Sequence, residues 1–234
     1  MAHPLVKRIL DRFLAQGFGA HDLSRVTAVI APDESVIRVI AYARQTLFGV
    51  GAARLHDQLV PIAAAWSGEA TAVEPYKDRA TAVAAVAKTE RLLAASGKAP
   101  NATIAARIQG HAGELFRALW PHLQIEADAL AAEAQRGLAQ RARRESDELR
   151  TLLERQRGAI DKAEARLRQS DLFDVQDKEQ KRQIDLDLKH LERRRGEAAL
   201  ELTSEPKAIE ALYEVRMSRL TPIGLVIAWP EMMT

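Results

Sequence analysis

The chain has 234 residues, 47% of them hydrophobic and 28% charged, so it is long enough to bury the core of one large or two small domains. With 34 basic and 32 acidic residues its net charge is +2, which gives no whole-molecule indication of nucleic-acid binding. The absence of cysteine excludes disulfides, thiolate zinc sites and cysteine nucleophiles, and it is typical of a reducing cytoplasm. The sequence has no run of about 18 apolar residues and no signal-peptide pattern. We therefore expect a cytoplasmic protein without a membrane partner.

Three helices are predicted in the first half of the chain. Residues 4–16 form the first, because a set of apolar residues shares one side of it. These residues are Leu5, Val6, Ile9, Leu10, Phe13 and Leu14. Residues 78–95 form the second helix, and residues 103–119 form the third, with Asn101 as its N-cap. Pro121 then either kinks a continuous helix or starts a new one.

A small antiparallel sheet is predicted between the first two helices. Residues 24–30 and 36–43 are strand candidates, and the turn sequence of residues 32–35 between them predicts a hairpin. Residues 59–65 are ambiguous between strand and helix. Pro61 favours a third strand at a sheet edge, because proline cannot donate a ladder hydrogen bond. The segment that follows, up to residue 75, is expected to be a loop.

The strongest pattern in the chain is an apolar stripe that begins after Pro121, breaks near residues 170–174, and then resumes. Its steps of three and four residues place apolar side chains on one side of each of two helices. Two such helices joined by a short turn, with Asp174 as the cap of the second, predict an antiparallel coiled-coil hairpin. The stripe consists of Leu130, Ala134, Leu138, Ala142, Leu149, Leu152, Ile160, Ala163 and Leu167, and then Ile184, Leu188, Leu191, Ala198 and Leu202.

The C-terminal part predicts one more helix and a last strand. Residues 204–206 have the composition of a helix start, and the helix would carry Ile209, Leu212, Val215 and Leu220. Residues 222–230 are a short apolar run between prolines, which we expect to return as a strand to the N-terminal sheet.

These elements predict an α+β fold that is mostly helical, with a small antiparallel sheet packed against helices and a long coiled-coil hairpin. We expect a small α/β base domain over residues 1–120. The helical arm covers residues 121–203, and residues 204–234 return to the base.

Three patterns with catalytic associations are better explained structurally. Gly97 and Lys98 lack the first glycine and the Ser or Thr of a phosphate-binding loop, since Leu92 and Ala99 occupy those places. The acidic pair at residues 147–148 lies within the amphipathic stripe, so we expect a solvated helix face and not a magnesium site. The six histidines show no zinc-ligand spacing, and His111 is expected to be a partly buried packing residue. No metal site and no cofactor are predicted in this chain.

Arginines concentrate on both helices of the predicted hairpin. Such runs can follow a phosphate backbone, although acids interleave here and a plain solvated surface is the competing interpretation. The candidate nucleic-acid contacts are Arg141, Arg143, Arg144, Arg150, Arg157, Arg193, Arg194 and Arg195.

The order of elements resembles the C-terminal region of bacterial Swi/Snf-type helicases of the RapA/HepA group. Five segments carry the likeness: residues 3–6, 24–30, 36–43, 129–157 and 219–227. The ending, together with the preceding Tyr213-Glu214-Val215-Arg216, is most similar to helicases of phage-defence loci such as DISARM.

The resemblance implies a helicase C-terminal domain without the motor, because the chain lacks the motor motifs that bind ATP and magnesium. No catalytic residue can therefore be assigned, and the chain is expected not to be an enzyme. Expected partners are the helicase motor domains, double-stranded DNA and other proteins of an antiviral defence system. A protein–protein interaction scaffold with no nucleic-acid role is the alternative, and a free-standing enzyme is disfavoured because no nucleophile–base set is present.

Overall fold

The computed structural model describes residues 25–69, 73–95, 97–172 and 178–234. The chain divides into two compact units. The sheet unit comprises the described parts of residues 1–47, 56–132 and 218–234, and the hairpin unit comprises residues 48–55 and the described parts of 133–217. The predicted helix over residues 4–16 and the predicted cap at Asp174 lie outside the described residues.

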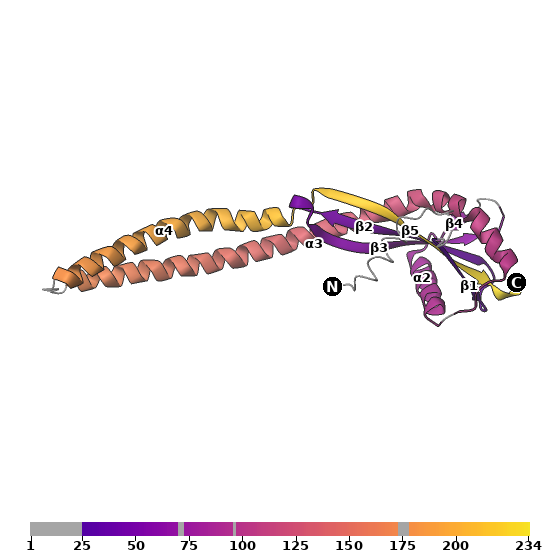
Figure 1. Cartoon of the computed structure of the whole chain (residues 1–234), viewed down its shortest axis with the longest axis horizontal. Helices are drawn as coiled ribbons and strands as arrows, with labels where there is room; N and C mark the ends of the chain where they lie inside the picture. The colour runs from indigo at the N-terminus through magenta and orange to yellow at the C-terminus, as the bar shows by residue number, and fades with distance from the viewer. Residues whose placement is uncertain (1–24, 70–72, 96, 173–177) are drawn as a thin grey trace. The chain divides into compact units, whose positions relative to one another are not determined.

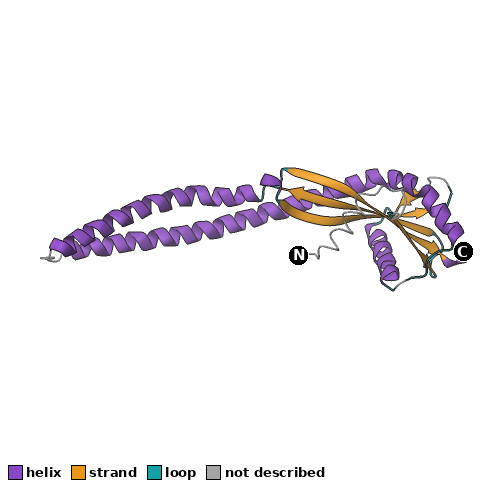
Figure 2. Ribbon diagram, viewed as in Figure 1, coloured by secondary structure: helices purple, strands orange, loops and turns teal. Residues whose placement is uncertain are grey.

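The sheet unit is built on five strands in the order β1-β5-β2-β3-β4. Figure 2 shows these strands in orange. Their bounds are β1 Val26–Ala31, β2 Ile37–Phe48, β3 Arg54–Trp66, β4 Val73–Pro75 and β5 Met217–Pro230. Strand β5 pairs with β1 in parallel, with Val26 opposite Leu225. The predicted α+β class, mostly helical, is confirmed, but the sheet is mixed and not antiparallel as predicted, because β1 and β5 run parallel.

The predicted hairpin between the first two strands is wrong, because β5 lies between β1 and β2. A turn sequence reports only on the local chain direction, and it cannot reveal a strand that arrives from almost two hundred residues later. The third strand is present but longer than expected. It is not the edge of the sheet throughout, because β4 pairs with residues 64–66 and occupies part of the expected loop.

The two faces of the sheet are covered by different helices. Helix α3 (Ala102–Leu172) begins against one face, where Ile108, Leu115 and Leu119 join a core with Trp66 and Trp229. Helix α2 (Arg79–Ala94) packs against the other face, with Ala85 in contact with the cluster that contains Ile40 and Ala63. The last strand, predicted to return to the sheet, does so, and it lies as an interior strand between β1 and β2.

Both helices begin with a side-chain cap. Asp78 accepts a hydrogen bond of 2.8 Å from the Thr81 backbone N–H at the start of α2. Asn101 accepts one of 2.9 Å from the Ile104 N–H, which confirms its predicted role as the N-cap of α3.

Prolines lie inside both long helices. Pro121 is within α3, which is continuous, and this resolves the alternative that the sequence left open. Pro206 is within α4 (Lys178–Leu212), so the predicted helix start at residues 204–206 is wrong. Pro206 is buried, and the packing of its side chain offsets the free-energy cost of the backbone hydrogen bond that proline cannot donate. Two residues expected in that helix lie beyond it: Val215 follows α4, and Leu220 belongs to β5.

The hairpin unit joins the C-terminal part of α3 to α4 as antiparallel neighbours (Figure 1). Two contacts fix the register: Ser146 donates a hydrogen bond of 3.0 Å to Glu210, and Arg195 pairs with Glu164 at 3.0 Å. As the α3 number rises the α4 number falls, so the predicted antiparallel pairing of these segments is confirmed.

The seam follows the predicted apolar stripe with one shift. Leu153 is 7% exposed and lies in the seam, whereas Leu152, which the stripe included, is 60% exposed. The 3.5-residue repeat of a coiled coil places residues 146, 153, 160 and 167 in line, and that line passes through Leu153. Ala142, Ile160, Ile184 and Ala198 are buried as expected.

Candidate nucleic-acid interface

Four arginines recur at seven-residue steps along α3: Arg136, Arg143, Arg150 and Arg157. A seven-residue step returns to nearly the same side of a helix in a coiled coil, so these residues form a ladder beside the seam. Their steps along the helix are about 10 Å at 1.5 Å per residue. Glu164 is the next position of the ladder, and it is buried beneath Arg168 and Arg195.

The opposite helix places both uncharged and acidic residues beside this ladder. On the same side of the seam, the residues of α4 at seven-residue intervals are Glu192, Ala199 and Pro206, and Tyr213 is the next residue at this interval after α4. The Arg168–Glu192 pair at 3.4 Å and the shared hollow that Arg143 and Tyr213 line fix the two ends of this alignment. The same hollow is also lined by Glu210 and Glu214, so acids lie beside Arg143, whereas no ion pair joins Arg143 or Arg157 to an acid among the described residues.

Four of the eight predicted contact residues are engaged by acids of the hairpin. Arg141 pairs with Glu145 at 2.8 Å, and Arg150 has only a long contact of 3.6 Å with Asp147. Arg194 pairs with Glu201 at 2.8 Å, and Arg195 pairs with Glu164 as described. Among the residues that the structure describes, the other four are exposed and form no hydrogen bond or ion pair. They are Arg143, Arg144, Arg157 and Arg193.

The structure brings part of the predicted set together and separates the rest. Arg143, Arg150 and Arg157 lie in line on the ladder, and Arg195 lies near its Glu164 end. Arg193 and Arg194 project from other sides of α4, because they precede Arg195 by one and two residues on a helix. The predicted set omitted Arg136, which continues the ladder, although its seven-residue spacing is readable from the sequence.

A second cluster ties the start of the ladder to the end of α4. Tyr213 donates a hydrogen bond of 2.6 Å to Glu145, and the Arg141 guanidinium lies 5.5 Å from the centre of the Tyr213 ring. The hydrogen bond from Tyr213 and then that from Arg141 lower the pKa of the Glu145 carboxyl from its usual 4.5. The same hydrogen bond raises the pKa of Tyr213. Arg141 is thus committed to structure and is a poor candidate for a phosphate contact.

Tyr213→Phe is expected to raise the pKa of Glu145 toward its usual value, because it removes the hydrogen bond that lowers it most. A carboxyl group whose pKa is lowered by folding stabilises the folded state at pH values above its unfolded-state pKa. This contribution is lost as the pH falls through its folded-state pKa. The variant should therefore be less stable than the wild type at pH 7, and the difference should close as the pH falls below 4.5 and through the lowered folded-state pKa of Glu145.

Carboxyl NMR titration of Glu145 and thermal unfolding across this range measure both effects. Tyr76→Phe is the control. A Glu145 titration midpoint that is the same in Tyr213→Phe and the wild type would contradict the assignment.

The remaining sequence motifs have structural roles in the described part of the chain. The backbone carbonyl of Lys98 accepts a hydrogen bond of 2.8 Å from Ile30, so Lys98 belongs to a segment that follows the edge of β1. Asp147 and Glu148 are on an exposed helix face, as expected. His111 is half-buried and meets the Trp66 ring edge-on at 5.6 Å, which confirms its packing role. No group of three potential metal-ligating side chains was found among the described residues.

Comparisons with known proteins give no relative from which a role could be transferred. No protein-family model, no curated protein and no solved structure matches the chain. The described helices also include none with the length and apolar character needed to cross a membrane. The helicase resemblance therefore stays a prediction, and the arginine ladder is the strongest functional feature of the described surface.

Proposed function

We propose that this chain is a non-catalytic C-terminal accessory module of an ATP-dependent DNA translocase of an anti-phage defence system. In this proposal one side of the hairpin unit binds the phosphate backbone of double-stranded DNA. The arginine ladder carries the DNA part of the proposal, and the resemblance of the quoted segments to RapA/HepA-type helicases supports the translocase part. ATP and magnesium would be bound by the motor domains and not by this chain.

Guanidinium groups suit this role because they stay charged and bind phosphate oxygens through two parallel hydrogen bonds. Arg143, Arg150 and Arg157 span about 21 Å of helix, which equals about six base pairs of B-form DNA. Contacts of this kind neutralise charge and hold the duplex without reading bases. Three phosphate contacts predict that the logarithm of the association constant falls with the logarithm of salt concentration with a slope of about −2.7.

Charge reversal on the ladder tests the proposal. The triple variant Arg143→Glu, Arg150→Glu and Arg157→Glu is expected to weaken binding of the full chain to a 20-bp duplex by at least about tenfold at 50 mM salt. The measurement is fluorescence anisotropy at several salt concentrations.

The matched control reverses three exposed bases elsewhere on the hairpin, Arg155→Glu, Lys162→Glu and Lys189→Glu, which gives the same net charge. Because both triple variants change the overall charge equally, only the first should remove the salt-dependent binding. Equal losses in the two variants, or no binding by the wild type at low salt, would contradict the DNA proposal.

The alternative function, a protein–protein scaffold, has a specific but weaker observation in its favour. Leu186 and Leu200 on α4 are 53% and 72% exposed. They are fourteen residues apart, with Arg193 at the intermediate seven-residue step, so they do not make the continuous apolar strip that helix docking requires. Retention of a partner that is lost in Leu186→Glu and kept in the arginine triple variant would favour the scaffold.

A further inference from the structure

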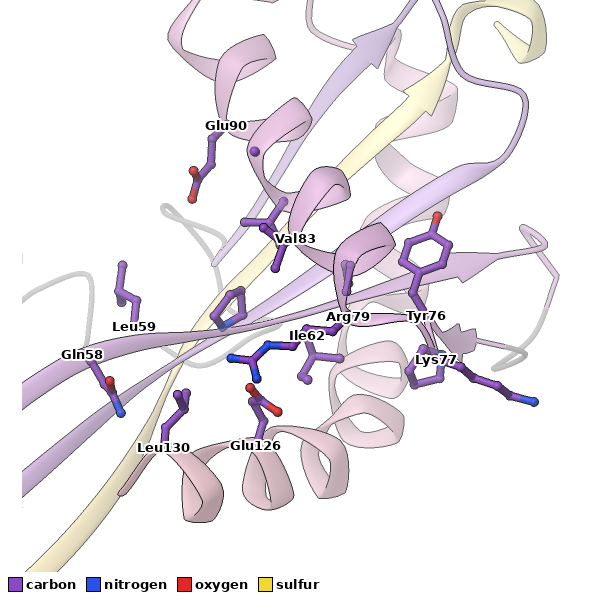
Figure 3. A pocket seen from close by; sticks show the side chains of 16 residues that line it. Gln58, Leu59, Ile62, Tyr76, Lys77, Arg79, Val83, Glu90, Glu126 and Leu130 are labelled. Atoms are coloured by element: carbon purple, nitrogen blue, oxygen red, sulfur yellow. The ribbon is translucent and has the colours of Figure 1, made fainter. Parts of the chain in front are cut away.

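An open groove lies in the sheet unit between α2, β3 and the sheet-covering part of α3. Its volume is about 540 Å³. In Figure 3, Leu59 from β3 and Val83 from α2 lie on one side of β3, and Ile62 and Leu130, which pack against the core with α3, lie on the other. Leu59 and Val83 are 59% and 60% exposed, so two large apolar side chains of this groove lack cover. Apolar surface of this kind gains free energy when another apolar surface covers it.

The edge of β3 explains why the groove is open. Strand β4 pairs only with residues 64–66 of β3, and the Tyr76 N–H adds one bond of 3.1 Å to the Ala63 carbonyl. Backbone groups alternate along a strand, so Pro61 presents its backbone on the same edge two residues earlier. Proline has no N–H to donate, which disfavours an added strand there. A helix, which satisfies its own backbone groups, is the better occupant of this groove.

We propose that residues 4–16 of the same chain dock into this groove as an amphipathic helix. These residues lie outside the described part of the structure, and their sequence places six apolar residues on one side. The opposite side carries Lys7, Arg8 and Arg12 against the single acid Asp11. Charged residues of both signs line the groove, Glu90 and Glu126 together with Lys77 and Arg79, so the apolar side of the segment and not its charge carries the proposal. The proposal is independent of the DNA-binding proposal, because it concerns only the sheet unit.

The length of the connection allows this placement. The described chain begins at Arg25, whose carbonyl accepts a hydrogen bond of 2.9 Å from Leu225 in β5. The Gln45–Ser218 contact relates β2 to β5, and the Arg44–Asp57 contact relates β2 to β3. Along these antiparallel strands Leu225 is level with about residue 38 of β2, which is level with about Ala63 of β3. From β1 to β3 the chain must cross three strand spacings, about 14 Å. Residues 17–24 reach up to about 26 Å when extended, so the segment can arrive at the groove.

Cysteine cross-linking of the full chain tests the placement, because the chain has no cysteine of its own. Leu10→Cys on the apolar side is combined with Val83→Cys in the groove, and Arg8→Cys with Val83→Cys is the control. Under a short bismaleimide the Leu10 pair is expected to cross-link within one chain about tenfold faster than the Arg8 pair, because docking gives a high effective concentration. Equal rates would overturn the proposal. Cross-links found only between a tagged and an untagged copy would also overturn it, and they would assign the groove to a second copy.

Hydrogen exchange gives a second measurement that needs no cross-link. Phe13→Asp is expected to reduce amide protection at residues 59–62 of β3 and along α2, since a charge on the apolar side opposes docking. Arg12→Asp, on the polar side, should leave that protection unchanged. Identical protection in the wild type and Phe13→Asp would overturn the proposal even if both variants remain fully folded.

Discussion

Gly224→Ala is expected to lower the free energy of unfolding by about 2–3 kcal/mol, in the range found for overpacked sites. A Cβ atom at this position would lie 2.4 Å from the backbone carbonyl oxygen of Arg25. That oxygen accepts the 2.9 Å hydrogen bond from Leu225, so it cannot turn away without breaking the pairing of β1 with β5. The atom that would clash belongs to the backbone of Arg25, so the rotation of a side chain cannot relieve the contact.

A matched glycine offers the opposite expectation. Gly137 lies in the interior of α3, and a Cβ atom there would meet nothing within 4 Å. Gly137→Ala should therefore stabilise the protein by about 0.5–1 kcal/mol, because alanine restricts the unfolded chain and favours the helix. Denaturant unfolding followed by circular dichroism measures both variants. Equal effects of the two substitutions would show that the close approach of β1 and β5 is not rigid.

Leu153→Ala is expected to cost about 2–4 kcal/mol in the hairpin unit, whereas Leu152→Ala should change stability by less than about 0.5 kcal/mol. Leu153 is buried in the seam between α3 and α4, and its neighbour is 60% exposed. The same atoms are removed in both variants and helix propensity changes equally, so the difference isolates the burial term.

Hydrogen exchange along α3 and α4 reports on this unit separately from the sheet unit. The buried-site variant should raise exchange on both helices, and the exposed-site variant should not. Equal exchange in the two variants would contradict burial of Leu153 alone, and raised exchange only in Leu152→Ala would place Leu152 in the seam, as the apolar stripe suggests.

The hairpin was predictable because its cause is local and repeated. Steps of three and four residues over many turns define a helix side, and acids and bases fill the remainder. What the stripe did not settle is which of two adjacent leucines is buried, because an α-helix and a coiled coil drift apart by about 20° per heptad. Contacts such as Arg195 with Glu164 then fix the register.

The sheet order was not predictable from local rules. Residues 24–30 and 36–43 are separated by a turn sequence and look like a hairpin, yet a strand from the other end of the chain separates them. The prediction from Pro206 was wrong for a similar reason. Proline is common at the start of a helix, but here it is buried inside the continuous helix α4. Long-range pairing depends on surfaces that no short window contains.

The candidate interface was predictable in composition but not in arrangement. The arginines are evident in the sequence, and the structure shows which of them form ion pairs with acids of the hairpin. Arg194 and Glu201 are seven residues apart on one helix and pair at 2.8 Å, a contact that needs actual side-chain positions. The pairing of Arg195 with Glu164 likewise depends on the register between two helices that are joined by a turn.

The position of β5 between β1 and β2 has a consequence for how the protein is made. Strand β1 is synthesised early, but its hydrogen-bonded neighbour is the segment Met217–Pro230. During synthesis on the ribosome, β1 therefore lacks its hydrogen-bonded neighbour until β5 has left the ribosome. The helical hairpin, whose contacts are close in sequence, has no such delay, so its helices should form first during translation and the sheet should close last.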